Sequence, residues 1–184
     1  MIAGIIVLAI ILLVVFAVLL IYNNLVRLRM SVKTAWSQID VQFKRRYDLI
    51  PNLVETVKGY AAHERQTLDE VVQARQQALS AKNVHDQAQA ENILTGALRQ
   101  LFALSESYPN LKANENFLQL QSELANTENQ ISTARQFYNN TVQQYNSAIQ
   151  VLPAVLFAQM LGFGPQDFFE LENAHERTVP KVQF

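Results

Sequence analysis

Hydrophobic residues divide the chain into one unbroken apolar stretch and a longer region in which apolar positions recur with helical spacing. Residues 2–21 contain no charged or strongly polar side chain. Twenty helical residues span about 30 Å, which matches the hydrocarbon thickness of a bilayer. A helix that is apolar on all sides suits lipid better than the core of a small domain. The pattern therefore predicts a transmembrane anchor over residues 1–22.

A cleaved signal peptide is the main alternative to a retained anchor. Such a signal has a basic start, a short apolar stretch and a small-residue cleavage site. Here no lysine or arginine precedes Ile2, the apolar run is longer, and no A-x-A pattern closes it. These features favour an anchor that stays attached to the domain behind it.

The region after the anchor has apolar residues at every third or fourth position, which is typical of helices. One helix is expected to continue from the anchor to a turn at residues 48–51, because Pro51 disfavours helix at the preceding residue. Further helices are predicted over 51–82, 86–107 and 113–152. No segment alternates with period two. The predicted fold class is all-α, with an N-terminal transmembrane helix followed by an antiparallel bundle of long helices over 23–152 and an apolar, aromatic C-terminal segment and tail over 153–184.

The fourth predicted helix has two distinct faces. Its apolar seam follows a 3.5-residue repeat, as in a coiled coil or bundle. The seam residues are Phe117, Leu120, Leu124, Thr127, Ile131, Ala134, Tyr138, Thr141, Tyr145, Ala148 and Leu152. Between residues 114 and 150 there are 14 Gln or Asn but only four charged residues. Because interface cores are depleted of charge, an amide face that includes Gln136, Asn140 and Gln143 could mediate self-association; a simple solvated face is the alternative.

Charge indicates how the chain sits at a membrane. Residues 23–46 carry six Lys or Arg against one acid, and the positive-inside bias then predicts the N-terminus outside and the domain in the cytoplasm. Arg27, Arg29 and Lys33 lie within reach of anionic lipid, each worth about 1 kcal/mol. The absence of cysteine fits a reducing compartment. The net charge of −1 favours no nucleic-acid partner.

The residues just after the anchor carry a distinctive sequence. Residues 35–41 read AWSQIDV and residues 45–53 read RRYDLIPNL. This stretch resembles the LemA protein family, and the likeness extends to the anchor, to the Tyr138-Asn139 and Tyr145-Asn146 steps, and to the Leu161-Gly162-Phe163 end. The resemblance implies long antiparallel helices on one N-terminal span in a bacterial inner membrane. It also implies a poorly defined function: one branch is associated with magnetosomes and intracellular membrane building, other members are often encoded near membrane proteases, and no catalytic residues are known to carry over.

Candidate chemistry is sparse. The histidines at 63, 85 and 175 are too far apart for a local metal motif, and there is no H-E-x-x-H, phosphate loop, cysteine nucleophile or G-x-S-x-G elbow. We therefore expect no enzymatic activity and no cofactor. A metal held by His63, Glu64 and a distant acid is the weaker alternative.

The densest group of charges lies in the first helix and consists of Asp40, Lys44, Arg45, Arg46 and Asp48. These residues could simply support the helix through i,i+4 pairs such as Asp40–Lys44 and through capping, worth a few tenths of a kcal/mol per pair. Alternatively they form a docking surface. In a straight helix they lie roughly 30 Å from the membrane, too far to reach headgroups through several Debye lengths. Their partner would then be another membrane protein or a neighbouring subunit.

The apolar C-terminal segment has two interpretations. In an up-down bundle the fourth helix, about 57 Å long, returns toward the bilayer and delivers Phe157, Leu161 and Phe163 to its surface. These residues could insert at the interface or cap the open end of the bundle. Together with the anchor and the amide face, they favour a non-enzymatic, homo-oligomeric scaffold that organises or remodels lipid membrane. The alternative is an adaptor for another membrane protein, such as a quality-control protease or an envelope-stress component.

Overall fold

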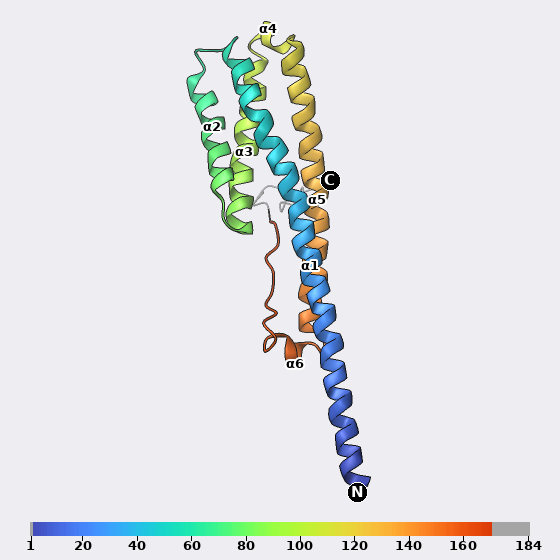
Figure 1. Cartoon of the computed structure of the whole chain (residues 1–184). Coiled ribbons are helices and arrows are strands. Elements are labelled where there is room, and N and C mark those ends of the chain that lie inside the picture. The colour runs from blue at the N-terminus through green and yellow to red at the C-terminus, as the bar shows by residue number, and fades with distance from the viewer. Residues whose placement is uncertain (1, 171–184) are drawn as a thin grey trace, which may run out of the picture. The chain divides into compact units, whose positions relative to one another are not determined.

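The computed structural model describes residues 2–170, which form helices and no strand (Figure 1). The helices are α1 (Ile2–Lys58), α2 (Arg65–Ser80), α3 (Val84–Ser105), α4 (Pro109–Lys112), α5 (Glu115–Gln150) and α6 (Val155–Ala158). The predicted fold class, an apolar N-terminal helix followed by a helical bundle, is confirmed. The helices predicted over 86–107 and 113–152 correspond to α3 and α5, with ends shifted by two residues.

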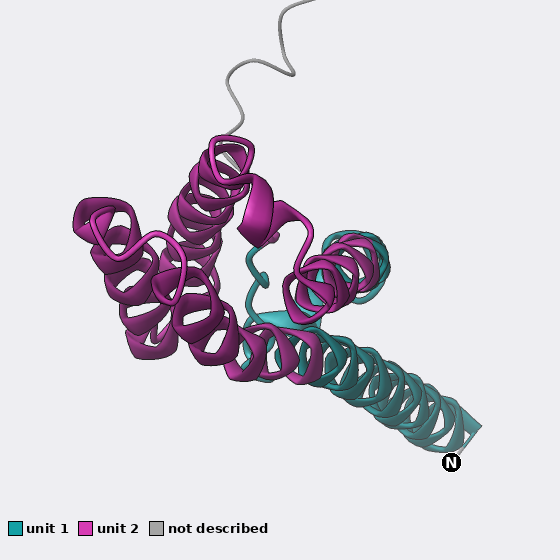
Figure 2. Ribbon diagram, turned by 90° about the horizontal axis from the view of Figure 1, so that it is seen from above, with its two compact units in different colours: residues 1–40, 133–167 teal, residues 41–132, 168–184 magenta. Residues whose placement is uncertain are grey.

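The chain divides into two compact units (Figure 2). Unit 1 contains residues 1–40 and 133–167, so it holds the first part of α1, the last part of α5, and α6. Unit 2 contains residues 41–132 and the segment from 168 onward, and it holds the rest of α1 and α5 together with α2, α3 and α4. Each unit has its own apolar core.

The apolar start of α1 is exposed. It is the one helix among the described residues that is long and apolar enough to cross a membrane, and the rest of the chain buries none of its most apolar window. A soluble core helix would be covered by its neighbours. This stretch therefore fits a membrane anchor.

The turn predicted at residues 48–51 is wrong, because α1 continues through Pro51 to Lys58. Proline lacks the N–H that would bind the carbonyl four residues earlier, which belongs to Tyr47. In the fold that carbonyl accepts a hydrogen bond of 2.8 Å from Nε of Arg75 on α2. Ile50 and Leu53, on either side of the proline, are completely buried and hold the helix in the core of unit 2.

The end of α1 also divides the helix predicted over 51–82. Residues 59–64 form a turn, so the first part of that segment belongs to α1 and only Arg65–Ser80 forms α2. The α2–α3 connection is short, and α3 begins where the Asn83 side chain accepts a hydrogen bond of 2.8 Å from the Asp86 amide. Such a cap satisfies a backbone donor that has no partner inside the helix. The two helices pack side by side in unit 2 (Figure 1).

The seam predicted on α5 lies largely in the core. Seven of its positions are buried: Phe117, Leu124, Thr127, Ile131, Tyr138, Thr141 and Tyr145. Leu152, the last predicted member, is 74% exposed because α5 ends at Gln150. In unit 1 the seam meets α1, where Trp36 is half-buried and its ring lies 5.3 Å from that of Tyr138 in an edge-to-face contact.

Candidate functional site

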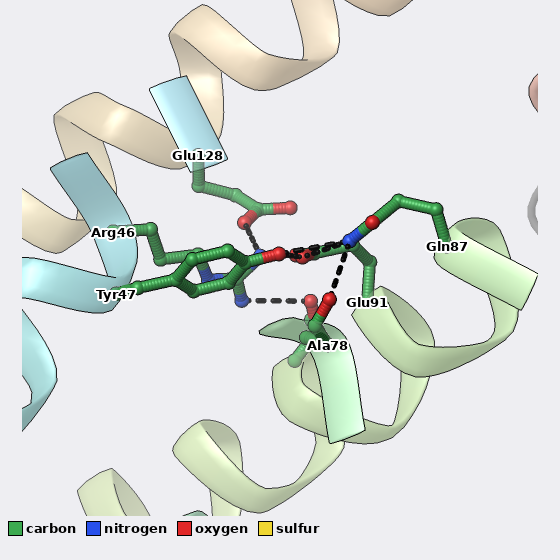
Figure 3. A network of polar contacts seen from close by, with 7 residues as sticks. Arg46, Tyr47, Ala78, Gln87, Glu91 and Glu128 are labelled. Carbon is green, nitrogen blue, oxygen red and sulfur yellow. Dashed lines mark hydrogen bonds and ion pairs between the residues drawn. The ribbon is translucent and has the colours of Figure 1, made fainter. Parts of the chain in front are cut away.

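A buried ion-pair network lies in unit 2 and is centred on Arg46 of α1 (Figure 3). One guanidinium nitrogen lies 3.1 Å from Glu91 of α3 and 3.0 Å from Glu128 of α5. The second terminal nitrogen of the guanidinium donates a hydrogen bond of 2.8 Å to the hydroxyl of Thr95. Arg46 therefore cross-links three helices. Its side chain is only 5% exposed, which corrects the expectation that it belongs to an exposed docking cluster.

Glu91 is the buried acid of this network, and its second oxygen is also satisfied. Tyr47 donates a short hydrogen bond to it, and the Gln87 amide donates another at 3.1 Å. The same amide nitrogen donates to the Tyr47 hydroxyl at 2.8 Å and lies 3.3 Å from the Ala78 carbonyl of α2. Burial raises the pKa of Glu91, while Arg46 and the hydrogen bonds from Tyr47 and Gln87 oppose the increase.

The network acts as a brace, in the sense that it stabilises the packing of α1, α3 and α5. Arg46 contacts two carboxylates and one hydroxyl, and Glu91 contacts one cation and two hydrogen-bond donors. Each buried charged group therefore has partners. The sequence carried a signal for it that was missed: Gln87 and Glu91 stand four residues apart on the α3 face that also holds Ala88, Ala90 and Leu94. Two polar residues within an apolar stripe indicate a buried polar contact.

The other members of the predicted docking cluster are exposed. Asp40, Lys44 and Asp48 lie on the surface of α1, and Arg45 reaches Glu123 of α5 at 4.0 Å with both side chains substantially exposed. An exposed pair of this kind contributes little to stability. These four residues remain accessible to a partner.

A second candidate region lies in unit 1, where α1 emerges from its apolar stretch. Arg27, Arg29 and Lys33 are exposed there, as a lipid-facing role requires. Phe163, which was also expected at the membrane surface, is instead only 3% exposed. Its ring lies edge-on to Tyr22 with centroids 5.6 Å apart, and the guanidinium carbon of Arg29 lies 4.8 Å from its centroid. The aromatic ring of Phe163 therefore packs against α1 through an edge-to-face contact and a cation–π contact.

The chain after Phe163 runs back along α5 as a C-terminal strap (residues 163–167). Tyr145 donates to the Gly164 carbonyl at 2.9 Å, and Tyr138 donates to the Asp167 carbonyl at 2.8 Å. Between them, the Asn146 side chain exchanges two hydrogen bonds of 2.8 Å with the backbone of Gln166. Gly162, the residue before the strap, has a φ of +76°, a conformation that favours glycine. Tyr138, Tyr145 and Asn146, three of the four residues in the two Tyr-Asn steps, thus hold the strap.

The segment between α5 and the strap forms an apolar corner (residues 151–160). Leu152, Leu156 and Met160 are 74, 62 and 84% exposed, whereas Ala154 and Ala158 are buried. Phe157 and Leu161, which were expected at the membrane surface, are half-buried. One side of the corner therefore packs inward, as a cap would, while the other presents large apolar side chains outward.

The outer face of α5 in unit 1 has no charged side chain after Arg135. Gln136, Asn140 and Gln143 are all exposed on it, as the self-association hypothesis requires. Phe137 lies next to them and is 50% exposed. An aromatic side chain of this size at the surface was not singled out from the sequence.

The histidines form no metal centre within residues 2–170. His63 and His85 are both exposed, and no group of three potential ligands occurs among the described residues. His85 contacts its helix neighbour Gln89 at 3.2 Å. His175 lies outside the described residues.

This fold defines a class: helical bundles carried on a single long apolar helix that fits a membrane anchor. Within that class, the model of the LemA family matches residues 35–184, and the chain belongs to this family. It is similar to Protein LemA of Metamycoplasma hominis, with 30% identity over 144 residues that cover 76% of this chain and 64% of that protein. It is also similar to the magnetosome protein MamQ of Magnetospirillum gryphiswaldense and to MamQ 2 of Paramagnetospirillum magneticum. These are 22% and 23% identical, and each alignment covers 86% of this chain and 68% of the relative. The chain thus spans about two thirds of the length of its curated relatives.

Proposed function

We propose that this protein is a non-enzymatic membrane scaffold that self-associates through the outer face of α5 and thereby organises or remodels the bilayer. The observation that carries this proposal is the exposed, charge-free face that contains Phe137, Gln136, Asn140 and Gln143. Similarity to proteins named for the magnetosome supports a role in membrane organisation.

The chemistry of this face suits a second copy of the chain. Interface cores lose charged residues and gain aromatic ones, and Phe137 supplies such an aromatic anchor. Side-chain amides both donate and accept hydrogen bonds, so the amide face of one copy can bind polar groups elsewhere on the next copy, and such head-to-tail contacts can continue beyond a dimer. Copies fixed in one membrane by α1 would then pack side by side.

The proposal places the anchor in the bacterial inner membrane with the N-terminus outside and the bundle in the cytoplasm. The six basic residues over 23–46 support this orientation. Arg27, Arg29 and Lys33 are exposed and available to the anionic headgroups of the cytoplasmic leaflet.

The test compares full-length wild-type protein with Phe137→Glu, in mild detergent and in liposomes, by light scattering and electron microscopy. We expect large homo-assemblies of the wild type and small particles of the variant. Leu79→Glu is the matched control, because Leu79 is 48% exposed on α2 and so lies outside this face. Assembly should survive in the control. A wild-type protein that stays monomeric at native-like density in the bilayer contradicts self-association.

The alternative is an adaptor that docks another membrane protein through Asp40, Lys44, Arg45 and Asp48, which are exposed on α1. An adaptor stays small until its partner arrives, whereas a scaffold assembles alone. Crosslinking in cells from a photoreactive residue at position 44 would capture a partner of a different mass. Loss of that product in Asp48→Lys would support the adaptor over the scaffold.

A further inference from the structure

The folded part of unit 1 begins before the apolar stretch of α1 has ended. Side chains over residues 2–16 are exposed, but Ala17, Val18 and Ile21 are half-buried. The overlap between the folded part and the apolar run 2–21 is therefore about five residues, or roughly 7 Å of helix. If that run spans the bilayer, the part of unit 1 that packs against residues 17–21 lies at the depth of the membrane interface.

The apolar corner is fastened at this level. Phe163, three residues after the end of the corner, contacts Tyr22 at 5.6 Å between ring centroids and Arg29 through its ring face. Figure 1 shows α6 beside α1 in this part of unit 1. The strap then leads the chain away along α5, held by hydrogen bonds to Tyr145 and Asn146.

The outward side of the corner is unusually apolar. Leu152, Leu156 and Met160 are each more than 60% exposed, and no charged residue occurs between Arg135 and Asp167. Exposed apolar patches of this kind mark interaction sites. The absence of charge removes the main obstacle to contact with acyl chains.

The neighbouring charges fit a lipid surface. Arg27 and Arg29 are exposed one to two turns beyond Tyr22, on the side away from the apolar run. Along the direction of α1, the apolar corner is followed by the aromatic Tyr22 and then by the basic residues Arg27 and Arg29. Acyl chains, the interface and anionic headgroups follow one another in the same order in a bilayer. A lipid surface matches both the apolar corner and the charges beside it.

We propose that the apolar corner enters the interface of the leaflet that α1 leaves, and so gives each chain a second membrane attachment. The inserted side chains are Leu152, Leu156 and Met160. Phe163 fixes their depth because it packs against Tyr22 and Arg29 of α1. The depth of roughly 7 Å lies within the 5–10 Å typical of interfacial elements. This inference rests on the proposed anchoring by α1, and it explains remodelling, because a wedge in one leaflet expands that leaflet alone.

The test uses the full-length chain in vesicles of phosphatidylcholine and phosphatidylglycerol. Because the chain contains no cysteine, Met160→Cys can carry a single environment-sensitive fluorophore. Val41→Cys is the matched control, because Val41 is 63% exposed on α1 and lies beyond the basic residues that follow Tyr22. We expect blue-shifted emission at position 160 and its loss when lipids carry a spin label near the carbonyl. The label at position 41 should emit as in water and keep its intensity.

Several outcomes would overturn the proposal. Water-like emission at position 160 means that the corner does not enter lipid. A blue shift that spin-labelled lipid does not quench means that a second copy covers the corner. In both cases the scaffold proposal stands if the protein still resists alkaline carbonate extraction and still assembles. Release of the protein by carbonate overturns the anchoring and the second attachment together.

Discussion

At the residue scale, Arg46 shows how burial changes the structural role of a charged side chain. In the sequence it stands beside Arg45 in a polar run, yet in the fold it is 5% exposed and bound by Glu91 and Glu128. Arg45, one position away, points to the surface and meets Glu123. Since neighbouring residues on a helix are about 100° apart, one of two adjacent arginines can brace the core while the other stays in solvent.

Glu91→Ala should lower the free energy of unfolding by about 3 kcal/mol, because it leaves the buried guanidinium of Arg46 with a single carboxylate, that of the half-exposed Glu128. The measurement is urea unfolding of the full-length protein in detergent, followed by circular dichroism. Glu55→Ala is the control. Its side chain is 74% exposed and pairs with the exposed Lys58, so we expect a loss below about 0.5 kcal/mol. Equal losses in the two variants would contradict the role of the network as a brace.

At the element scale, α1 depends on α2 for its continuity. Pro51 removes one hydrogen bond from the interior of α1, and Arg75 replaces it at the Tyr47 carbonyl. α5 and the strap depend on each other in a similar way, since tyrosine and asparagine side chains of α5 bind the backbone of the strap. In both cases a side chain from one element satisfies the backbone of another.

A double-mutant cycle tests the replacement at Pro51. Arg75→Met should cost about 1–3 kcal/mol in the wild-type background, because it leaves a buried carbonyl without a donor. In the Pro51→Ala background it should cost less, because the backbone N–H at position 51 can then serve that carbonyl. Unfolding of all four proteins gives the coupling free energy. A coupling of zero would show that Arg75 does not compensate for the proline.

The strap should weaken at high pH through Tyr138. Burial, aided by the charge of Asp167, raises the pKa of Tyr138 to about 12 from its ordinary value of 10.0. The neutral hydroxyl donates to the Asp167 carbonyl, so the stability that it contributes is complete below pH 10 and is lost as the pH rises through 12. Tyr138→Phe should reduce stability at neutral pH by about 1 kcal/mol and lack this loss. Parallel pH profiles of the wild type and the variant would contradict this assignment.

At the scale of the whole molecule, the chain combines an apolar helical stretch with two compact units that differ in their packing and surface. Unit 2 is braced by a satisfied polar network, whereas unit 1 holds the apolar corner, the strap and the charge-free face of α5. The surfaces that we propose for self-association and for lipid lie in unit 1, which also contains the apolar start of α1.

The proposed orientation predicts which side of the membrane each part faces. A single cysteine at position 73, an exposed site on α2, should react with a membrane-impermeant maleimide only after spheroplasts are opened. A cysteine added before Met1 should react in intact spheroplasts. The reverse pattern would place the bundle outside and overturn the assignment made from the positive charges over residues 23–46.

The sequence alone determined what depends on local composition and periodicity. An apolar run of bilayer length identified the stretch that fits a membrane anchor, a three-to-four spacing identified helices, and the gap between the helices predicted over 86–107 and 113–152 separated α3 from α5. The exposed positions Gln136, Asn140 and Gln143 also followed, because they lie opposite a regular seam. These inferences needed only neighbours within the same helix.

The tertiary structure decided what depends on partners far along the chain. Pro51 stays helical because Arg75 supplies a donor, Arg46 is buried because Glu91 and Glu128 surround it, and Phe163 leaves the surface because it packs on Tyr22 and Arg29. A buried polar group is stable only where every partner is in place, and an aromatic residue is buried only where another element covers it. No local pattern contains that information, since the fold alone brings those partners together.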